Sequence, residues 1–216
     1  QYFFMNKNWS NQFYKQNEEV FLNEIKKVKF SSILPSDKIT KTFIENITAS
    51  QICVLGETHG ILENVQVYFD IIKLGGFTAV GLEWDRKLEK VLYKYIKTGK
   101  LDFKTIQDSP DGRITAGHFV LFRELVEQGY VKRVFCFDQW DKNWDKRDLN
   151  MAKNIESKLK KNKKTLIITG LTHVQNSPKF GDETHVSVVD HLQKKHPKLV
   201  VAKISFKSGY YQNFGK

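Results

Sequence analysis

The sequence predicts an α/β fold with a mainly parallel central sheet flanked by helices. Short apolar runs rich in β-forming residues alternate with stretches whose apolar residues recur at helical spacing, which is the pattern of strands joined by crossover helices. Four of the apolar runs lead into an acidic residue or a histidine. Because ligands bind beyond the carboxyl ends of parallel strands, we expect a functional site at that edge of the sheet.

The composition is that of one folded domain. The chain has 216 residues, of which 40% are hydrophobic and 13% aromatic, which is enough for a single buried core. We expect one domain over residues 1–216, with an N-terminal arm and helix over residues 1–35 and the core over residues 36–206. Cys53 and Cys136 fall inside predicted strands, so they are expected to be core residues and not a disulfide.

The net charge of +11, from 35 Lys and Arg against 24 Asp and Glu, raises the question of an anionic partner. The sequence carries no zinc-finger, helix-turn-helix or RNA-binding motif. We therefore expect a small-molecule or peptide substrate and no nucleic acid, with an anionic membrane surface and the oligomeric state left open. The excess is concentrated in lysines near predicted helix ends, where a solvated face is expected: Lys158, Lys160, Lys161, Lys163, Lys164, Lys194, Lys195 and Lys198.

The sequence leaves the compartment open. No apolar run approaches the ~18 residues that a membrane-spanning helix needs. The chain begins at Gln1, a start that fits a secreted, periplasmic or lipid-anchored protein whose targeting segment has been removed.

Two helices are expected before the first strand. From Ser10 to Phe30 the apolar residues have an imperfect helical spacing, and Ser10 is a candidate N-cap. A second helix opens at Ser36-Asp37, where the acidic residue favours the first turn. Residues 1–9 show no clear period and are expected to form an arm.

The first strand, residues 52–55, runs into the sequence Gly-Glu-Thr-His-Gly at residues 56–60. Glycine permits a tight turn there, so Glu57 and His59 are predicted to lie over the edge of the sheet. The following helix, Ile61 to Leu74, ends at two glycines in the manner of a left-handed C-cap.

The second strand, Phe77 to Leu82, reaches Glu83, and the helix from Arg86 to Lys97 follows it. Residues 100–116 break the pattern and contain a strong turn signal, Ser-Pro-Asp-Gly. We expect this segment to form a lid or an irregular crossover.

The third strand, Val131 to Phe137, follows a short helix and reaches Asp138. The segment from Asp138 to Arg147 is expected to be a loop in which Trp140 and Trp144 wall a pocket.

A helix over residues 149–159 precedes the fourth strand, residues 165–169, which leads into Gly-Leu-Thr-His at residues 170–173. A polar loop over residues 174–184 is expected after it. The remaining expected elements are a helix at residues 186–195 and a last strand at residues 199–206.

The candidate catalytic residues are those that the strand ends bring together. The sequence Gly-x-x-His occurs twice after a predicted strand, and water is the expected nucleophile because no Gly-x-Ser-x-Gly elbow is present. A histidine beside carboxylates serves as a general base on water. The predicted catalytic set is Glu57, His59, Glu83 and His173, with Asp138, Arg147 and His185 as additional candidates.

A metal site is the alternative chemistry for the same residues. Two imidazoles and a carboxylate with an open position are a common set of ligands for a catalytic divalent ion. His59, Glu83 and His173 are the conditional metal ligands, and the bound ion would then acidify its water.

Four stretches of the chain are similar to the erythromycin-esterase-like and ChaN-like superfamily, which is related to the TraB and TIKI proteins. They are Leu55–Gly60, Gly75–Glu83, Arg147–Ile155 and Ile168–His173. The resemblance implies an α/β fold with both histidines, Glu57 and Glu83 at one edge of the sheet.

The superfamily includes several functions, and the resemblance carries all of them as expectations. Some members are esterases or metal-dependent membrane peptidases, ChaN-like members bind haem and support iron uptake, and related domains occur in bacterial toxins. We expect a small hydrolase acting on an ester or amide. The alternatives are a non-catalytic protein that binds haem or another iron-related ligand, with His or Tyr as axial ligand, and a toxin or effector domain.

Overall fold

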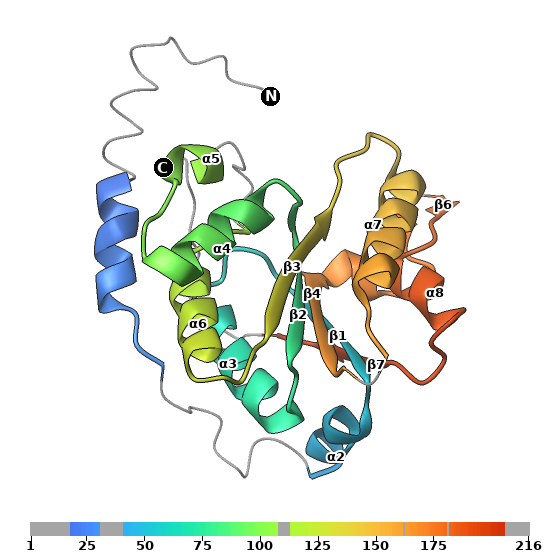
Figure 1. The fold of residues 1–216 in the computed structure, drawn as a ribbon. Helices are drawn as coiled ribbons and strands as arrows, with labels where there is room; N and C mark the ends of the chain where they lie inside the picture. Colours follow the sequence, from blue (N-terminus) through green and yellow to red (C-terminus); the bar gives the residue numbers. More distant parts are fainter. Residues whose placement is uncertain (1–17, 31–40, 108–112, 162, 181, 206–216) are drawn as a thin grey trace.

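The computed structural model describes residues 18–30, 41–107, 113–161, 163–180 and 182–205. Within them, five parallel strands form one sheet in the order β3-β2-β4-β1-β7 (Figure 1). The predicted parallel α/β fold is therefore confirmed. The strands of this sheet are β1 (Ile52–Glu57), β2 (Ala79–Asp85), β3 (Arg133–Asp138), β4 (Thr165–Gly170) and β7 (Val200–Lys203).

Helices cover both faces of the sheet. Figure 1 shows α3, α4 and α6 on one face and α7 and α8 on the other. Residues 18–27 are also helical, and Phe21 packs edge-on against Phe103 and Phe119 of the first face. The other helices are α2 (Lys41–Ala49), α3 (Asn64–Gly75), α4 (Leu88–Thr98), α5 (Phe103–Gln107), α6 (Ala116–Glu127), α7 (Trp144–Lys158), the 3₁₀ helix η1 (Leu171–Val174) and α8 (Val188–Gln193).

The core lies in two layers, one on each side of the sheet. Cys53 and Leu55 of β1 belong to the cluster that includes α3, α4 and α6, whereas Ile52 and Val54 belong to the cluster that includes α7 and α8. Successive side chains of a strand point to opposite faces, so both faces of β1 are buried. This explains why the strands are continuous apolar runs without polar alternation.

Several predicted boundaries are wrong. The first strand does not turn at Gly56 but continues through Gly56 to Glu57. The second strand continues past Leu82 through Glu83 and Trp84, which are both buried, so Glu83 is part of the strand. Helix α7 begins at Trp144, five residues before the predicted start, because the Asn143 side chain accepts a hydrogen bond from the Lys146 backbone N–H (2.8 Å) and caps it. The last four residues of the predicted loop from Asp138 to Arg147 are therefore helical.

The other elements lie close to their predicted positions. Gly76 adopts the predicted left-handed C-cap of α3 (φ 65°). The predicted polar loop contains a small antiparallel hairpin, β5 (Lys179–Phe180) and β6 (Glu183–Thr184). The predicted arm over residues 1–9, the Ser10 cap, the Ser36-Asp37 helix start and the Ser-Pro-Asp-Gly turn lie outside the described residues.

Lys164 does not belong to a solvated face. Its Nζ donates hydrogen bonds to the backbone oxygens of Ile47 and Thr48 in α2 and of Gly75 at the end of α3. A cation is favoured at helix C-termini, where carbonyl groups lack partners. This lysine therefore holds the ends of two helices against the start of β4.

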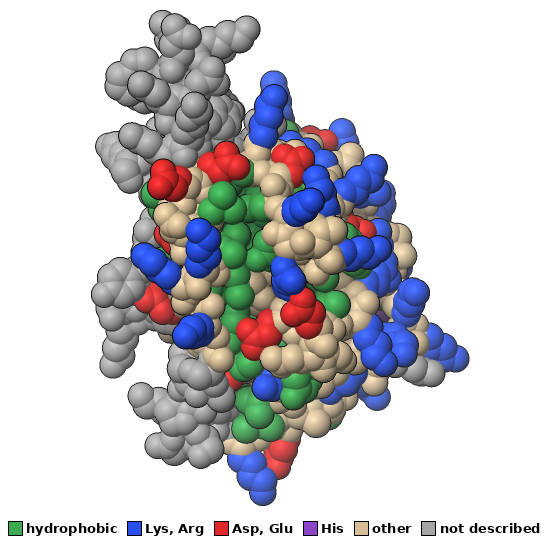
Figure 2. Space-filling model, turned by 60° about the vertical axis from the view of Figure 1, so that its left-hand side comes forward, with side chains coloured by type: hydrophobic (Ala, Val, Ile, Leu, Met, Phe, Trp, Pro, Cys, Tyr) green, Lys and Arg blue, Asp and Glu red, His purple; other side chains and the backbone are tan. Residues whose placement is uncertain are grey.

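Other composition-based expectations agree with the described structure. Cys53 and Cys136 are both free and buried. On the right-hand side of the view in Figure 2, Lys and Arg side chains lie close together with few acidic side chains between them. Among the described residues, no helix has both the length and the apolar character needed to cross a membrane.

Candidate functional site

The strand order brings the predicted site residues to one edge of the sheet. Glu57 ends β1, Asp138 ends β3, Gly170 ends β4, and Glu83 lies near the end of β2. These four strands are neighbours, and Glu57 lies directly beside Gly170 in the sheet. Because all of them are parallel, their carboxyl ends meet as expected.

A pocket of 450 Å³ lies over these strand ends. Its lining includes all four predicted catalytic residues, although they come from segments more than 100 residues apart in the chain. The full lining is Glu57, Thr58, His59, Glu83, Arg113, Trp140, Trp144, Arg147, Gly170, Leu171, Thr172 and His173. Imidazoles and carboxylates that converge on one pocket are the arrangement that acid–base chemistry needs, and His59 is the member of the set that is partly exposed.

Glu83 is the centre of this pocket, and its carboxylate is almost fully buried. One oxygen, Oε1, accepts hydrogen bonds from Arg113 Nη1 (2.9 Å) and Arg147 Nη2 (3.0 Å). The other, Oε2, accepts from Thr169 Oγ1 (2.6 Å) and the Gly170 backbone N–H (2.7 Å). Both histidines approach the same carboxylate.

His59 is held from one side only. Its Nδ1 lies 2.8 Å from Glu57 Oε1, while its Nε2 faces the pocket, 3.7 Å from Glu83 Oε2. The other oxygen of Glu57 accepts hydrogen bonds from Asn64 Nδ2 and the Tyr68 hydroxyl. This fixes the carboxylate, which in turn keeps the proton of neutral His59 on Nδ1 and leaves Nε2 as a base.

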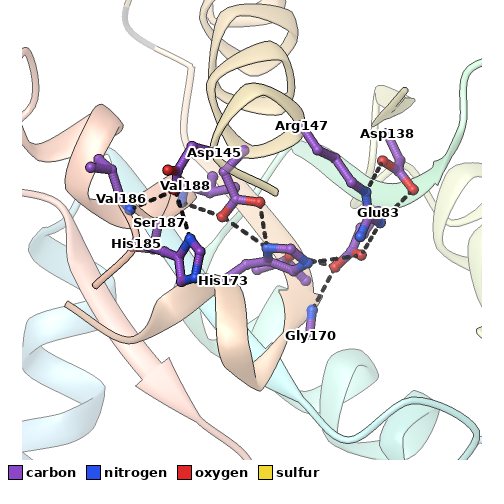
Figure 3. Close-up of polar contacts among 12 residues, drawn as sticks. Glu83, Asp138, Asp145, Arg147, Gly170, His173, His185, Val186, Ser187 and Val188 are labelled. Carbon is purple, nitrogen blue, oxygen red and sulfur yellow. Dashed lines mark hydrogen bonds and ion pairs between the residues drawn. The ribbon is translucent and has the colours of Figure 1, made fainter. Parts of the chain in front are cut away.

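His173 lies between two carboxylates, as Figure 3 shows. Its Nδ1 is 2.9 Å from Asp148 Oδ2, and its Nε2 is 3.4 Å from Glu83 Oε1. The ring stacks on Trp144 with a centroid separation of 4.8 Å and an interplanar angle of 8°. The Asp148 oxygen also accepts from the Val188 backbone N–H (3.0 Å), so it is fixed by α8.

Arg113 and Arg147 line the pocket, and both pair with Asp138 behind it. Asp138 accepts hydrogen bonds from Arg147 Nε (3.1 Å) and Nη2 (2.8 Å) and from Arg113 Nη1 (2.8 Å). Each arginine therefore bridges Asp138 and Glu83. Arg147 also lies over the rings of Trp140 and Trp144. These contacts indicate that Asp138 and Arg147 position Glu83.

The electrostatics of the pocket favour protonation of both histidines. Burial opposes protonation of His173, but the charge of Glu83 and the hydrogen bond to Asp148 raise its pKa to about 9. The pKa of His59 is also raised, because its hydrogen bond to Glu57 and the charge of Glu83 outweigh desolvation. The pKa of Glu83 is held well below its ordinary value: burial would raise it, but the charge of His173, its hydrogen bond, and the charges of His59 and Arg113 outweigh burial. At neutral pH, His173 is cationic and Glu83 is ionised.

Glu57 and His118 carry the opposite shifts. Burial raises the pKa of Glu57 despite its hydrogen bond to His59. His118 is buried beside Thr115, and burial lowers its pKa to about 3. His118 is thus a neutral packing residue that caps α6.

Some site residues were missed by sequence reasoning, and one candidate lies elsewhere. Arg113 and Asp148 contact the predicted residues directly, but neither was proposed as a site residue from sequence. Tyr68 and Asn64 fall within the helix predicted from Ile61 to Leu74, and no role in the site was predicted for either. His185 does not line the pocket: its Nδ1 is 3.2 Å from Asp145 Oδ1, and Figure 3 shows it on the far side of His173 from Glu83.

The donor set does not fit the metal alternative. Both oxygens of Glu83 already accept hydrogen bonds, and two of the donors are guanidinium groups whose charge repels a cation. Across the described ranges, no group of three or more His, Cys, Asp or Glu side chains is arranged to hold a metal ion.

The His59 imidazole can occupy its position because residue 170 is a glycine and has no side chain. A Cβ atom at Gly170 would lie 2.8 Å from His59 Nε2, although its backbone (φ −61°, ψ 150°) suits any residue. Gly170→Ala is therefore expected to displace the imidazole and lower kcat by about tenfold or more, since a 1 Å misplacement has such effects. Stability should change by less than about 1 kcal/mol, because an unstrained backbone tolerates alanine.

Gly129→Ala is the matched control. Gly129 has a left-handed backbone (φ 78°) and nothing within 4 Å of its Cβ position, so alanine there is expected to cost about 1 kcal/mol of stability and to leave kcat unchanged. Urea unfolding and steady-state kinetics on both variants check this. Full activity in Gly170→Ala would show that the tight contact has no role.

The chain matches no family model and no curated protein sequence. Its fold is similar to solved structures described as bacterial protein toxins. One has a TM-score of 0.56 and 18% identity over 82% of this chain and 38% of the other. A second has a TM-score of 0.53 and 17% identity over 80% of this chain and 41% of the other.

A third similar structure is the C-terminal region of Pasteurella multocida toxin, described as having a thiol-protease-like catalytic triad. Its TM-score is 0.54, with 12% identity over 81% of this chain and 26% of the other. The chain thus spans less than half the length of each of these structures. At these identities, the similarity shows the fold alone.

Proposed function

We propose that this chain is a hydrolase domain in which His59 activates water to cleave an ester or amide bond. The observation that carries the proposal is the orientation of His59, whose Nδ1 is held by Glu57 while Nε2 faces the pocket. This is the geometry of a general base. The resemblance of the pocket-forming stretches to a superfamily that includes esterases and peptidases adds support for this chemistry.

His59 suits the role of base better than His173. The His59 side chain is 28% exposed and the His173 side chain 4% exposed, so His59 is the more accessible of the two to water. With a pKa of about 9, His173 is protonated at neutral pH and cannot accept a proton. Its charge instead balances those of Glu83 and Asp148, and so helps to hold the Glu83 carboxylate beside His59.

The reaction then has balanced steps. His59 Nε2 takes a proton from water as the water oxygen forms a bond to the carbonyl carbon. Collapse of the tetrahedral intermediate breaks the bond to the leaving oxygen or nitrogen, which receives the proton from His59. Glu83, fixed by Arg113 and Arg147, holds both imidazoles in place.

A thiol mechanism is not part of this proposal. The described residues that line the pocket include no cysteine or serine. Burial raises the pKa of Cys53 to about 12, and that of Cys136 is also raised well above its ordinary value, so neither is a thiolate at neutral pH. In this respect the chain differs from the thiol-protease-like triad described for Pasteurella multocida toxin.

The direct test is hydrolysis in ¹⁸O-labelled water. Wild-type protein is incubated with a panel of para-nitrophenyl esters and peptides, and products are analysed by mass spectrometry. We expect one ¹⁸O atom in the new carboxylate and no covalent acyl-protein. Failure to hydrolyse any acyl substrate, or a trapped acyl-protein, would contradict the proposal. Hemin titration addresses the haem alternative, which a Soret shift would support.

The rate is expected to have a bell-shaped dependence on pH. Neutral His59 is needed as base, so kcat/KM should rise with pH through a pKa above the ordinary value of 6.5. Protonated His173 is needed as well, so kcat/KM should fall as pH rises through about 9. In His173→Gln, which cannot titrate, the alkaline limb should vanish and the acid limb should remain. An unchanged alkaline limb would rule out this role for His173.

A place in a bacterial toxin is the second candidate function. The support is the fold shared with three toxin structures, each of them much longer than this chain. Expression in yeast tests it: growth should be lost with the wild-type domain and retained with His59→Ala. Equal growth with both would count against an effector role.

A further inference from the structure

A second concavity, the α4 groove, adjoins the catalytic pocket. It has a volume of 970 Å³ and lies between α4, the residues after β2 and β3, and the end of α7. Trp140, whose side chain is largely exposed, lines both the groove and the pocket. The cationic residues of the groove are Arg86, Lys87, Lys90, Lys94, Lys97 and Lys158.

The carboxylates that line the α4 groove already have partners. Asp138 is held by Arg113 and Arg147. Glu89 accepts a hydrogen bond from the Cys136 backbone N–H (3.0 Å) and lies 3.6 Å from Lys158, and Asp85 lies 3.8 Å from Lys87.

Four cationic side chains of the groove have no acidic partner in the part of the chain that the structure describes, and all four are exposed. They are Arg86, Lys90, Lys94 and Lys97. The groove therefore has a positive charge that its own carboxylates do not neutralise.

The lysines of α4 form a straight row. Their spacing of three or four residues, from Lys87 through Lys90 and Lys94 to Lys97, places them on one face of the helix. The opposite face is buried, and includes Leu88 and Val91. The row is about 15 Å long at the rise of an α-helix, which is the span of about five extended residues.

A polypeptide segment in the α4 groove would bind through its own side chains and not through backbone hydrogen bonds to a strand. The outer edge of β3 is closed, because Glu89 accepts from the Cys136 N–H and the Tyr93 hydroxyl bonds the Val134 backbone. An added strand would need these backbone groups. Binding must then depend on charge, which makes it sensitive to salt.

We propose that the α4 groove binds an acidic segment of a polypeptide whose amide bond is cleaved in the adjoining pocket, an inference that rests on the proposed hydrolase function. A polypeptide has both carboxylates for the lysine row and acyl bonds for His59. The backbone of a nucleic acid has no carboxylic ester or amide bond, and a flat lipid surface does not enter a groove.

The test compares two triple variants with equal loss of charge. One is Lys90→Ala/Lys94→Ala/Lys97→Ala, and the control is Lys194→Ala/Lys195→Ala/Lys198→Ala, beyond the end of α8. The probe is a fluorescein-labelled ten-residue peptide with five consecutive glutamates, followed by fluorescence anisotropy at low and high salt. The α4 variant should bind about tenfold more weakly, from three contacts of roughly 0.5 kcal/mol each, and the control within about twofold of wild type.

Each outcome decides the proposal. Equal weakening in both variants would show non-specific charge attraction and overturn it. The same variants are tested with a ten-residue oligothymidylate and with vesicles that contain phosphatidylserine. If either binds more tightly than the peptide, and only the α4 variant loses that binding, the assignment to a polypeptide is overturned. Binding of the peptide by His59→Ala should equal that of wild type, because it precedes the chemistry.

Kinetics separate this proposal from the hydrolase function itself. If wild type cleaves peptides, the α4 variant should raise KM for a peptide with an acidic segment about tenfold relative to one without it, at similar kcat. An unchanged KM ratio would overturn the groove assignment and leave the hydrolase standing. Peptide binding at the groove without any cleavage would instead overturn the claim that the bound polypeptide is the substrate, while ester hydrolysis tests the hydrolase function separately.

Discussion

His59→Ala is expected to lower kcat by about 10²–10⁴-fold, the range that a general base contributes. The His59 imidazole lines the pocket and is 28% exposed, and its Nε2 makes no contact closer than the 3.7 Å to Glu83 Oε2 among the described hydrogen bonds and ion pairs. After its removal, Glu57 still accepts hydrogen bonds from Asn64 and Tyr68, so the buried carboxylate is not left without donors. The fold should therefore survive, and KM should change little.

His185→Ala is the matched control for this experiment. His185 is a histidine in an ion pair with Asp145, outside the pocket, and its loss should leave kcat within about twofold of wild type. Both variants are measured by steady-state kinetics on the same substrate, with circular dichroism to check folding. If His59→Ala keeps full activity, or if His185→Ala loses as much, His59 is not the base.

Glu83→Ala is expected to destabilise the fold by about 3–5 kcal/mol, the usual cost of removing one partner from a buried ion pair. The carboxylate balances Arg113, Arg147 and protonated His173, and it lies in a strand with both neighbours paired. Without it, Arg113 and Arg147 lose one of the two carboxylates that they share. Urea denaturation, with the slope checked for two-state behaviour, measures the change.

Glu127→Ala provides the contrast for Glu83→Ala. Glu127 also pairs with an arginine, Arg123, at 2.8 Å, but both side chains are exposed on α6. Solvent screens such a pair, so its loss should cost no more than about 0.5 kcal/mol. If the two variants are equally stable, the ion network around Glu83 does not support the fold as described.

The strand ends were predictable from sequence because each buried parallel strand is an unbroken apolar run. The first polar residue after such a run marks the exit from the core, as at Glu57 and Asp138. The glycines of the two Gly-x-x-His stretches mark where the chain can pass close to a side chain, and Gly170 does lie against His59.

The supporting residues were not predictable in the same way. Arg113 lies in a segment without periodicity, and its partners, Glu83 and Asp138, are 30 and 25 residues away in sequence. Asp148 lies in a helix that was predicted to begin at the next residue. Its role depends on His173, which only the tertiary fold brings beside it. These contacts depend on which strands are neighbours in the sheet, and no local sequence pattern predicts them.

The order of the strands also determines which part of the sheet must stay folded for the pocket to keep its shape. Glu83, Gly170 and Glu57 come from β2, β4 and β1, the three inner strands of the sheet, whereas β3 and β7 form its edges. Local opening of a protein begins at its edges and termini, and its central strands exchange their amide hydrogens most slowly. Fraying at β7 therefore leaves His59 and His173 close to each other. The two histidines separate only when the whole sheet unfolds.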